Sequence, residues 1–200
     1  ESNVRVSETY LQYDQPQIEG SFGCSTCDHS EDVDGVEAST NVSLIYKPIE
    51  KLTNKFTVAN TYIERIYGRS PNSGNKQQDN YYGERYSYLY QGNYNFNLDN
   101  SVVFGIERED DQMGLNANAG GRVDSNAYVT SQFFDYQSRI TNNIYGTIGA
   151  RFDEHSLAGG TGSNEDSHRA TLAYVFDDKT TKLKSSYGTG YRFPSLYELK

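Results

Sequence analysis

The chain has 200 residues, with 18 Lys and Arg against 27 Asp and Glu, and its formal net charge is −9. This charge argues against nucleic-acid binding, because such binding depends on clustered basic side chains. Only 35% of the residues are hydrophobic, and no segment approaches the roughly 18 consecutive apolar residues that a membrane-spanning helix needs. The 18 Tyr and 9 Phe argue against disorder, which leaves two classes: a tyrosine-rich soluble β protein and a membrane β-barrel.

Apolar and polar side chains alternate along most of the chain with the period of two that is typical of β-strands. Along Val36–Tyr46 most apolar residues fall on even positions, and the same alternation recurs at Tyr86–Phe96 and Ile144–Phe152. The pattern predicts nine strands, in chain order at 4–14, 34–47, 54–67, 81–97, 100–110, 125–140, 143–154, 167–177 and 181–191.

Short and long connections alternate between these predicted strands. The short ones lie at 49–53, 98–99, 141–142 and 178–180, and the long, polar ones at 15–33, 68–80, 111–124 and 155–166. In an up-and-down meander this order places all short turns at one edge of the sheet, as in bacterial outer-membrane barrels with short periplasmic turns and long extracellular loops. We therefore expect an all-β, antiparallel up-and-down transmembrane β-barrel, with a soluble antiparallel sheet as the alternative.

Three segments carry a resemblance to a known family. SSYGTGYRFPSLYEL at Ser185–Leu199 resembles the pattern SYGTGF-K-AP-SLYEL in the barrel of TonB-dependent outer-membrane receptors. IYGTIGARFDEHS at Ile144–Ser156 and NAYVTSQF at Asn126–Phe133 resemble two preceding strands of that family. The first motif is nearest to the vitamin B12 (cobalamin) receptor branch, with ferric-siderophore and haem receptors as close relatives. Phe193 replaces a common Ala, which does not disturb the expected fold.

The resemblance implies a barrel of about 22 strands around an N-terminal plug domain, whose TonB box receives energy from the inner-membrane TonB complex. We expect residues 1–200 to be a partial barrel domain of about nine strands, without the plug, the TonB box or the C-terminal strands. The implied partners are outer-membrane lipid, the missing plug and strands, the TonB complex and a bulky nutrient of the cobalamin, ferric-siderophore or haem type. A passive porin-like or adhesive barrel of the bacterial outer membrane is the alternative.

The first predicted loop contains two candidate sites. Cys24 and Cys27 favour a disulfide in an oxidising exterior over a zinc site, which needs two further ligands. Asp28, Asp32 and Asp34 are candidate ligands of a structural calcium ion, which takes six to eight oxygen ligands. The resemblance to cobalamin receptors, which have calcium-organised loops, favours calcium, whereas a solvated acidic loop is the alternative.

Tyr and Arg side chains near the loops and in the upper lumen are the candidate ligand contacts, because Tyr rings suit bulky ligand surfaces and guanidinium groups suit anions. These candidates are Tyr67, Arg69, Tyr81, Tyr82, Arg85, Arg108, Arg122 and Tyr191. The alternative is that they are girdle and lumen-wall residues without a ligand. The charges at Arg151, Asp153, Arg169, Lys182 and Lys184 are expected to pair across strands or with the plug.

No enzyme is expected from this sequence. His155 and Ser156 are the pair that a barrel-wall hydrolase would need, but neighbouring residues of a strand point to opposite faces. They therefore cannot form a catalytic dyad with each other.

Overall fold

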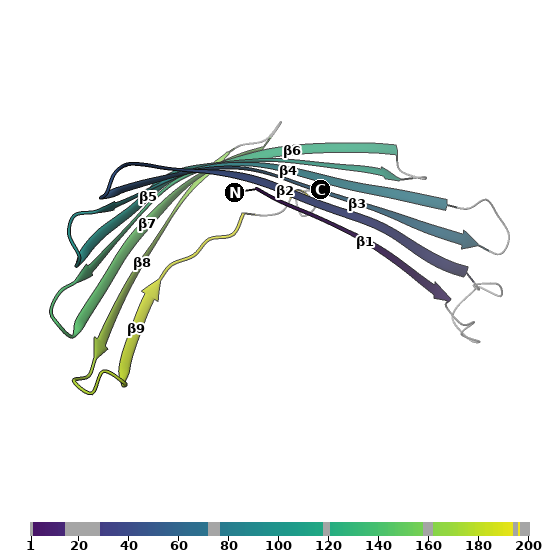
Figure 1. The fold of residues 1–200 in the computed structure, drawn as a ribbon. Helices are drawn as coiled ribbons and strands as arrows, with labels where there is room; N and C mark the ends of the chain where they lie inside the picture. Colours follow the sequence, from purple (N-terminus) through teal and green to yellow (C-terminus); the bar gives the residue numbers. More distant parts are fainter. Residues whose placement is uncertain are drawn as a thin grey trace.

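The computed structural model describes residues 2–14, 29–71, 77–117, 121–157, 162–193 and 196. The described residues form one antiparallel sheet of nine strands, whose order in space follows the sequence. The strands are β1 (Ser2–Asp14), β2 (His29–Ile49), β3 (Leu52–Pro71), β4 (Gln77–Asn95), β5 (Asn100–Ala117), β6 (Gly121–Arg139), β7 (Ile144–Leu157), β8 (Ser163–Val175) and β9 (Lys182–Gly188). The sheet is arched, and β1 and β9 form its two edges, so that it is an open wall (Figure 1). None of the described residues belongs to a helix long and apolar enough to cross a membrane.

The nine predicted strands and the antiparallel meander are confirmed, but the predicted bounds are wrong at one edge. The last strand was predicted to run to 191, yet β9 ends at Gly188, and other strands are longer than predicted. Residues 68–80 and 111–124 were expected to be loops, yet β3 runs to Pro71, β4 begins at Gln77 and β5 runs to Ala117. Backbone pairing continues through these polar stretches because the hydrogen bonds between strands join main-chain groups. They do not require an alternation of apolar and polar side chains. The short connections at the opposite edge are confirmed, at 50–51, 96–99, 140–143 and 176–181.

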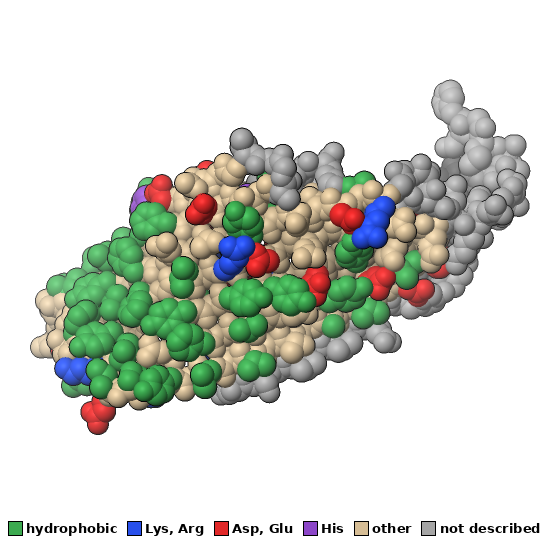
Figure 2. Space-filling model, turned by 90° about the horizontal axis from the view of Figure 1, so that it is seen from above, with side chains coloured by type: hydrophobic (Ala, Val, Ile, Leu, Met, Phe, Trp, Pro, Cys, Tyr) green, Lys and Arg blue, Asp and Glu red, His purple; other side chains and the backbone are tan. Residues whose placement is uncertain are grey.

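The register gives the sheet two different faces. Leu44 lies directly opposite Phe56, and Phe104 opposite Phe134, so even-numbered residues of β2 to β8 share one face. This is the convex face, on which hydrophobic side chains gather toward the short-turn edge at the left (Figure 2). Among the described residues only Ala127 and Ala173 are buried hydrophobic residues, so this wall has no apolar core of its own. The apolar part of the convex face therefore has to be covered by something other than the sheet.

The last short connection shows how these turns are held. The Asp178 carboxylate accepts hydrogen bonds from the backbone N–H groups of Thr180 and Thr181 and from the Thr181 hydroxyl, at 2.8–3.0 Å. These hydrogen bonds, chiefly the one from the Thr181 backbone, lower the pKa of Asp178 to about 2. Lys179 adopts the left-handed conformation with φ of 57° between them. The side chain of one residue thus organises the tight return from β8 to β9.

Candidate functional site

The concave face of the sheet carries a network of ion pairs and hydrogen bonds, which we call the Arg151 network. The Arg151 guanidinium donates to Asp153 Oδ1 at 2.8 Å, to Glu107 Oε2 at 3.0 Å and to Ser131 Oγ at 2.7 Å. Ser131 is only 1% exposed, and its hydroxyl donates in turn to Asp153. The network joins β5, β6 and β7. It confirms the predicted cross-strand ion pair for Arg151, whose partner is Glu107 on β5, whereas the ion-pair partner of Asp153 is Arg151 on the same strand.

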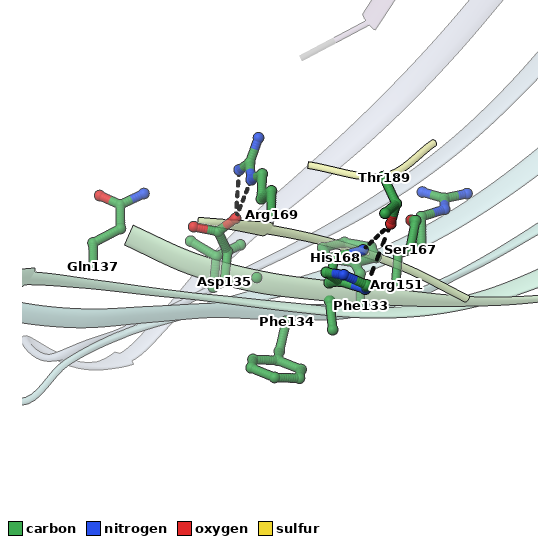
Figure 3. Close-up of a pocket in the computed structure, with 12 residues that line it drawn as sticks. Phe133, Phe134, Asp135, Gln137, Arg151, Ser167, His168, Arg169 and Thr189 are labelled. Atoms are coloured by element: carbon green, nitrogen blue, oxygen red, sulfur yellow. Dashed lines mark hydrogen bonds and ion pairs between the residues drawn. The ribbon is translucent and has the colours of Figure 1, made fainter. Parts of the chain in front are cut away.

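Three further ion pairs, formed by two Arg residues, lie on the same face. Arg85 forms a fork with both carboxylate oxygens of Asp111, at 2.6 and 2.8 Å, and a longer ion pair of 3.6 Å with Glu109. Arg169 on β8 reaches over β7 to the Asp135 carboxylate on β6. Phe134, the neighbour of Asp135, points to the opposite side of the sheet (Figure 3). Cations and carboxylates therefore alternate across the concave face, as in a polar lumen wall.

We expect the Arg151→Met variant of the complete receptor to lose about 1–2 kcal/mol of unfolding free energy, a value reduced for the partial exposure of Arg151. The substitution keeps much of the side-chain volume but leaves Glu107, Asp153 and Ser131 without their shared donor. Urea unfolding in detergent micelles measures the change.

Arg122→Met is the matched control, because Arg122 pairs with Asp124 in an exposed position, where ion pairs contribute little. Adding Glu107→Gln to Arg151→Met should recover part of the loss, since it removes one uncompensated carboxylate. Equal losses for Arg151→Met and Arg122→Met would contradict a structural role of the network.

Part of the predicted ligand set faces the concave side. The rings of Tyr67 and Tyr81 meet edge to face with centroids 5.3 Å apart. Tyr191 lies in the segment after β9, which returns beneath the arch, and its ring contacts Phe193 at 4.7 Å (Figure 1). The Phe193 ring stacks at 4.4 Å on His155, a buried residue of the concave face. Two predicted Tyr residues and the returning segment thus contribute aromatic surface to the side that also holds Arg85.

Three other predicted ligand residues lie on the convex face. Tyr82 donates its hydroxyl hydrogen to Asp124 at 2.6 Å, and Arg122 pairs with the same carboxylate at 2.8 Å. Arg108 pairs with Asp110 at 2.8 Å and lies 4.5 Å from the centre of the Tyr128 ring. These side chains therefore do not line the concave face. The backbone of the eighth candidate, Arg69, lies in β3, and its side chain is outside the described part. A ligand role for all eight stays a prediction.

The candidate disulfide and calcium sites are only partly covered by the structure. Cys24, Cys27 and Asp28 lie outside the described residues, so both sites stay predictions. Asp32 and Asp34 belong to β2 and not to a loop, and both occupy the even positions of the convex face. Within the described ranges, no group of three or more His, Cys, Asp or Glu residues is placed to hold a metal ion.

The remaining expectation concerns His155 and Ser156. They are consecutive residues of β7, and the register places them opposite Val129 and Tyr128, on different faces of the sheet. The His155 ring is buried against Phe193 on the concave side. The predicted reason why they cannot form a dyad is confirmed.

Sequence reasoning missed two residues of the concave face, Ser131 and Asp135. Both sit at odd positions of β6, the parity opposite to Phe134, which was the available signal for their face. Their partners come from other strands, Arg151 on β7 and Arg169 on β8, and no local spacing indicates those contacts.

Comparison with known proteins identifies the family. The family model described as TonB dependent receptor-like, beta-barrel, matches residues 28–200, which is most of the chain and all of β2 to β9. No curated protein and no solved structure matches the chain. The family consists of transporters and not of enzymes, and its barrel domain belongs to receptors of the bacterial outer membrane. From the match and the two-faced meander together, the chain belongs to the TonB-dependent receptor-like β-barrel family.

Proposed function

We propose that this chain forms part of the barrel wall of an outer-membrane receptor that takes up a scarce, bulky nutrient with energy from the TonB complex. The observation that carries the proposal is the family match over residues 28–200. The wall supports it, because the apolar part of the convex face suits lipid and the charged concave face suits a wet lumen. Cobalamin is the first candidate nutrient on the motif at Ser185–Leu199, followed by ferric siderophores and haem.

The aromatic surface of the concave face is the proposed place of ligand contact. Tyr67 is 40% exposed beside Tyr81, and Tyr191 is exposed on the returning segment. Flat, partly exposed rings can cover the apolar surface of a bulky ligand, while Arg85 on the same face of β4 as Tyr81 attracts anionic groups. Arg85 is already held by Asp111 and Glu109, so we assign the larger part of binding to the Tyr rings.

The direct test is uptake by cells that produce the complete receptor. Cells with the receptor should accumulate labelled cobalamin, ferric siderophore or haem, and the accumulation should stop when TonB is deleted or the proton gradient is collapsed. Equal accumulation with and without TonB would overturn energy-dependent uptake and favour the passive porin-like barrel. No accumulation of any of the three would overturn this substrate class.

The ligand surface is tested in the same cells with two Tyr variants of similar exposure. Tyr67→Ala should weaken binding of the accumulated nutrient about tenfold, which corresponds to about 1.4 kcal/mol. Tyr86→Ala is the matched control, because Tyr86 is 37% exposed but lies on the convex face. Unchanged binding in both variants would remove Tyr67 from the ligand surface and leave the transport proposal intact.

A further inference from the structure

The concave face contains a buried carboxylate that is only half used. Asp135 is 8% exposed, and its Oδ2 accepts both hydrogen bonds from Arg169, from Nε at 2.8 Å and from Nη2. Its Oδ1 is buried and accepts no hydrogen bond from any residue that the structure describes. An Arg–carboxylate pair is strongest when two parallel hydrogen bonds use both oxygens. Here both donors converge on one oxygen, and an acceptor with a negative charge is left without a partner, which is costly in a buried position.

A glycine on the neighbouring strand makes room for this carboxylate. Gly149 of β7 is the direct cross-strand partner of Asp135. A Cβ atom at position 149 would lie 2.7 Å from Asp135 Oδ2 and 3.1 Å from the Phe134 carbonyl oxygen. The Asp135 side chain therefore lies flat across the backbone of β7, and any larger residue at 149 would push it away. The free oxygen thus belongs to a specific local arrangement of two strands.

The carboxylate opens on a cavity of about 380 Å³ on the concave face, lined also by Phe133, Arg151, Ser167 and Arg169. In Figure 3 Asp135, Gln137 and Arg169 extend to the same side of the sheet. Both hydrogen bonds from Arg169 go to Oδ2, so the Arg169 side chain does not occupy Oδ1, which is left for a second donor. The volume falls within the range of pockets that hold small molecules or a large side chain.

The charges at the cavity favour a cation. Two guanidinium groups line the cavity, those of Arg151 and Arg169. They are paired with three carboxylates, of Glu107, Asp135 and Asp153. One negative charge is therefore in excess, and the unused oxygen is where a further donor would bind. A neutral donor would satisfy the hydrogen bond, whereas a cationic donor satisfies both the hydrogen bond and the charge.

We propose that this cavity binds a cationic N–H donor, an ammonium or guanidinium group, with Asp135 Oδ1 as its acceptor. The donor can come from a Lys or Arg side chain of another segment of the receptor, or from an amine-bearing solute in the lumen. The proposal rests on the Asp135 geometry and is independent of which nutrient the receptor transports.

The first arm of the test is an experimental structure of the complete receptor in an amine-free phosphate buffer. A Lys or Arg nitrogen from another segment within hydrogen-bond distance of Asp135 Oδ1 would support the proposal and identify the receptor itself as the source.

The second arm applies if no such side chain is found, and uses methylguanidinium as the probe. It should raise the unfolding temperature of the wild-type receptor in a saturable way, with at least tenfold weaker binding to Asp135→Asn. Asp166→Asn, which removes an exposed carboxylate of β8 from the opposite, convex face, should bind like wild type. A cavity without a Lys or Arg side chain, combined with no Asp135-dependent binding of methylguanidinium, would overturn the proposal.

Discussion

Ile148→Arg is expected to destabilise the complete receptor in a bilayer by about 2–4 kcal/mol, the cost of Arg or Lys near the midplane of a barrel's lipid face. Ile148 is 56% exposed on the convex face, with Tyr136 and Ala170 as its direct cross-strand partners. No part of the described sheet covers it. A guanidinium group at this position would therefore have to enter the hydrocarbon or draw water and headgroups toward itself.

Thr147→Arg is the matched control for this substitution. Thr147 is the preceding residue of β7, and its direct partners Gln137 and Thr171 are polar residues of the concave face. An Arg side chain there enters the wet side, so the expected loss is below about 1 kcal/mol. Urea titration of the receptor folded into lipid vesicles measures both variants. Equal losses would mean that the convex face does not contact lipid.

The central parts of the strands were predictable because the alternation of apolar and polar residues matches the two faces of the sheet there. In Tyr86–Phe96 and Ile144–Phe152 most apolar residues fall on even positions. The first segment extends one residue past the end of β4, and the second lies within β7. The outer ends of β3 and β4 were missed because polar residues occupy both faces once a strand has passed the apolar band. The alternation then disappears from the sequence, while the backbone ladder continues through Gly68 and Gln78.

The candidate site was predictable by residue type but not by position. Tyr81 and Tyr82 are adjacent in the sequence, yet only Tyr81 faces the concave side. The parity of the Tyr86–Phe96 stripe already placed Tyr82 on the apolar face, so that signal was available. The contact between Asp135 and Arg169 was not, because it spans from β6 to β8 and depends on two registers at once. Such contacts follow from the assembled sheet and leave no spacing pattern in the chain.

A glycine in the middle of the sheet gives the second large effect. Gly105→Ala is expected to cost about 1–3 kcal/mol of unfolding free energy, the range of overpacked sites. A Cβ atom at position 105 would lie 2.5 Å from the ring of Phe133, its direct partner on β6, and 2.4 Å from the Tyr90 carbonyl oxygen on β4. The ring can rotate away, but the carbonyl oxygen is part of the backbone and moves only if β4 and β5 separate.

Gly83→Ala separates this clash from the general effect of replacing a strand glycine. At position 83 a Cβ atom would lie 3.9 Å from the Gln112 carbonyl oxygen of the neighbouring strand, an ordinary contact. Ala there should be neutral or slightly stabilising, because it restricts the unfolded chain. Urea unfolding of both variants in micelles gives the difference. Adding Phe133→Leu to Gly105→Ala should recover only part of the loss, because the Tyr90 carbonyl remains in place. Full recovery would instead assign the whole cost to the Phe133 ring and show that β4 and β5 can move apart at little cost.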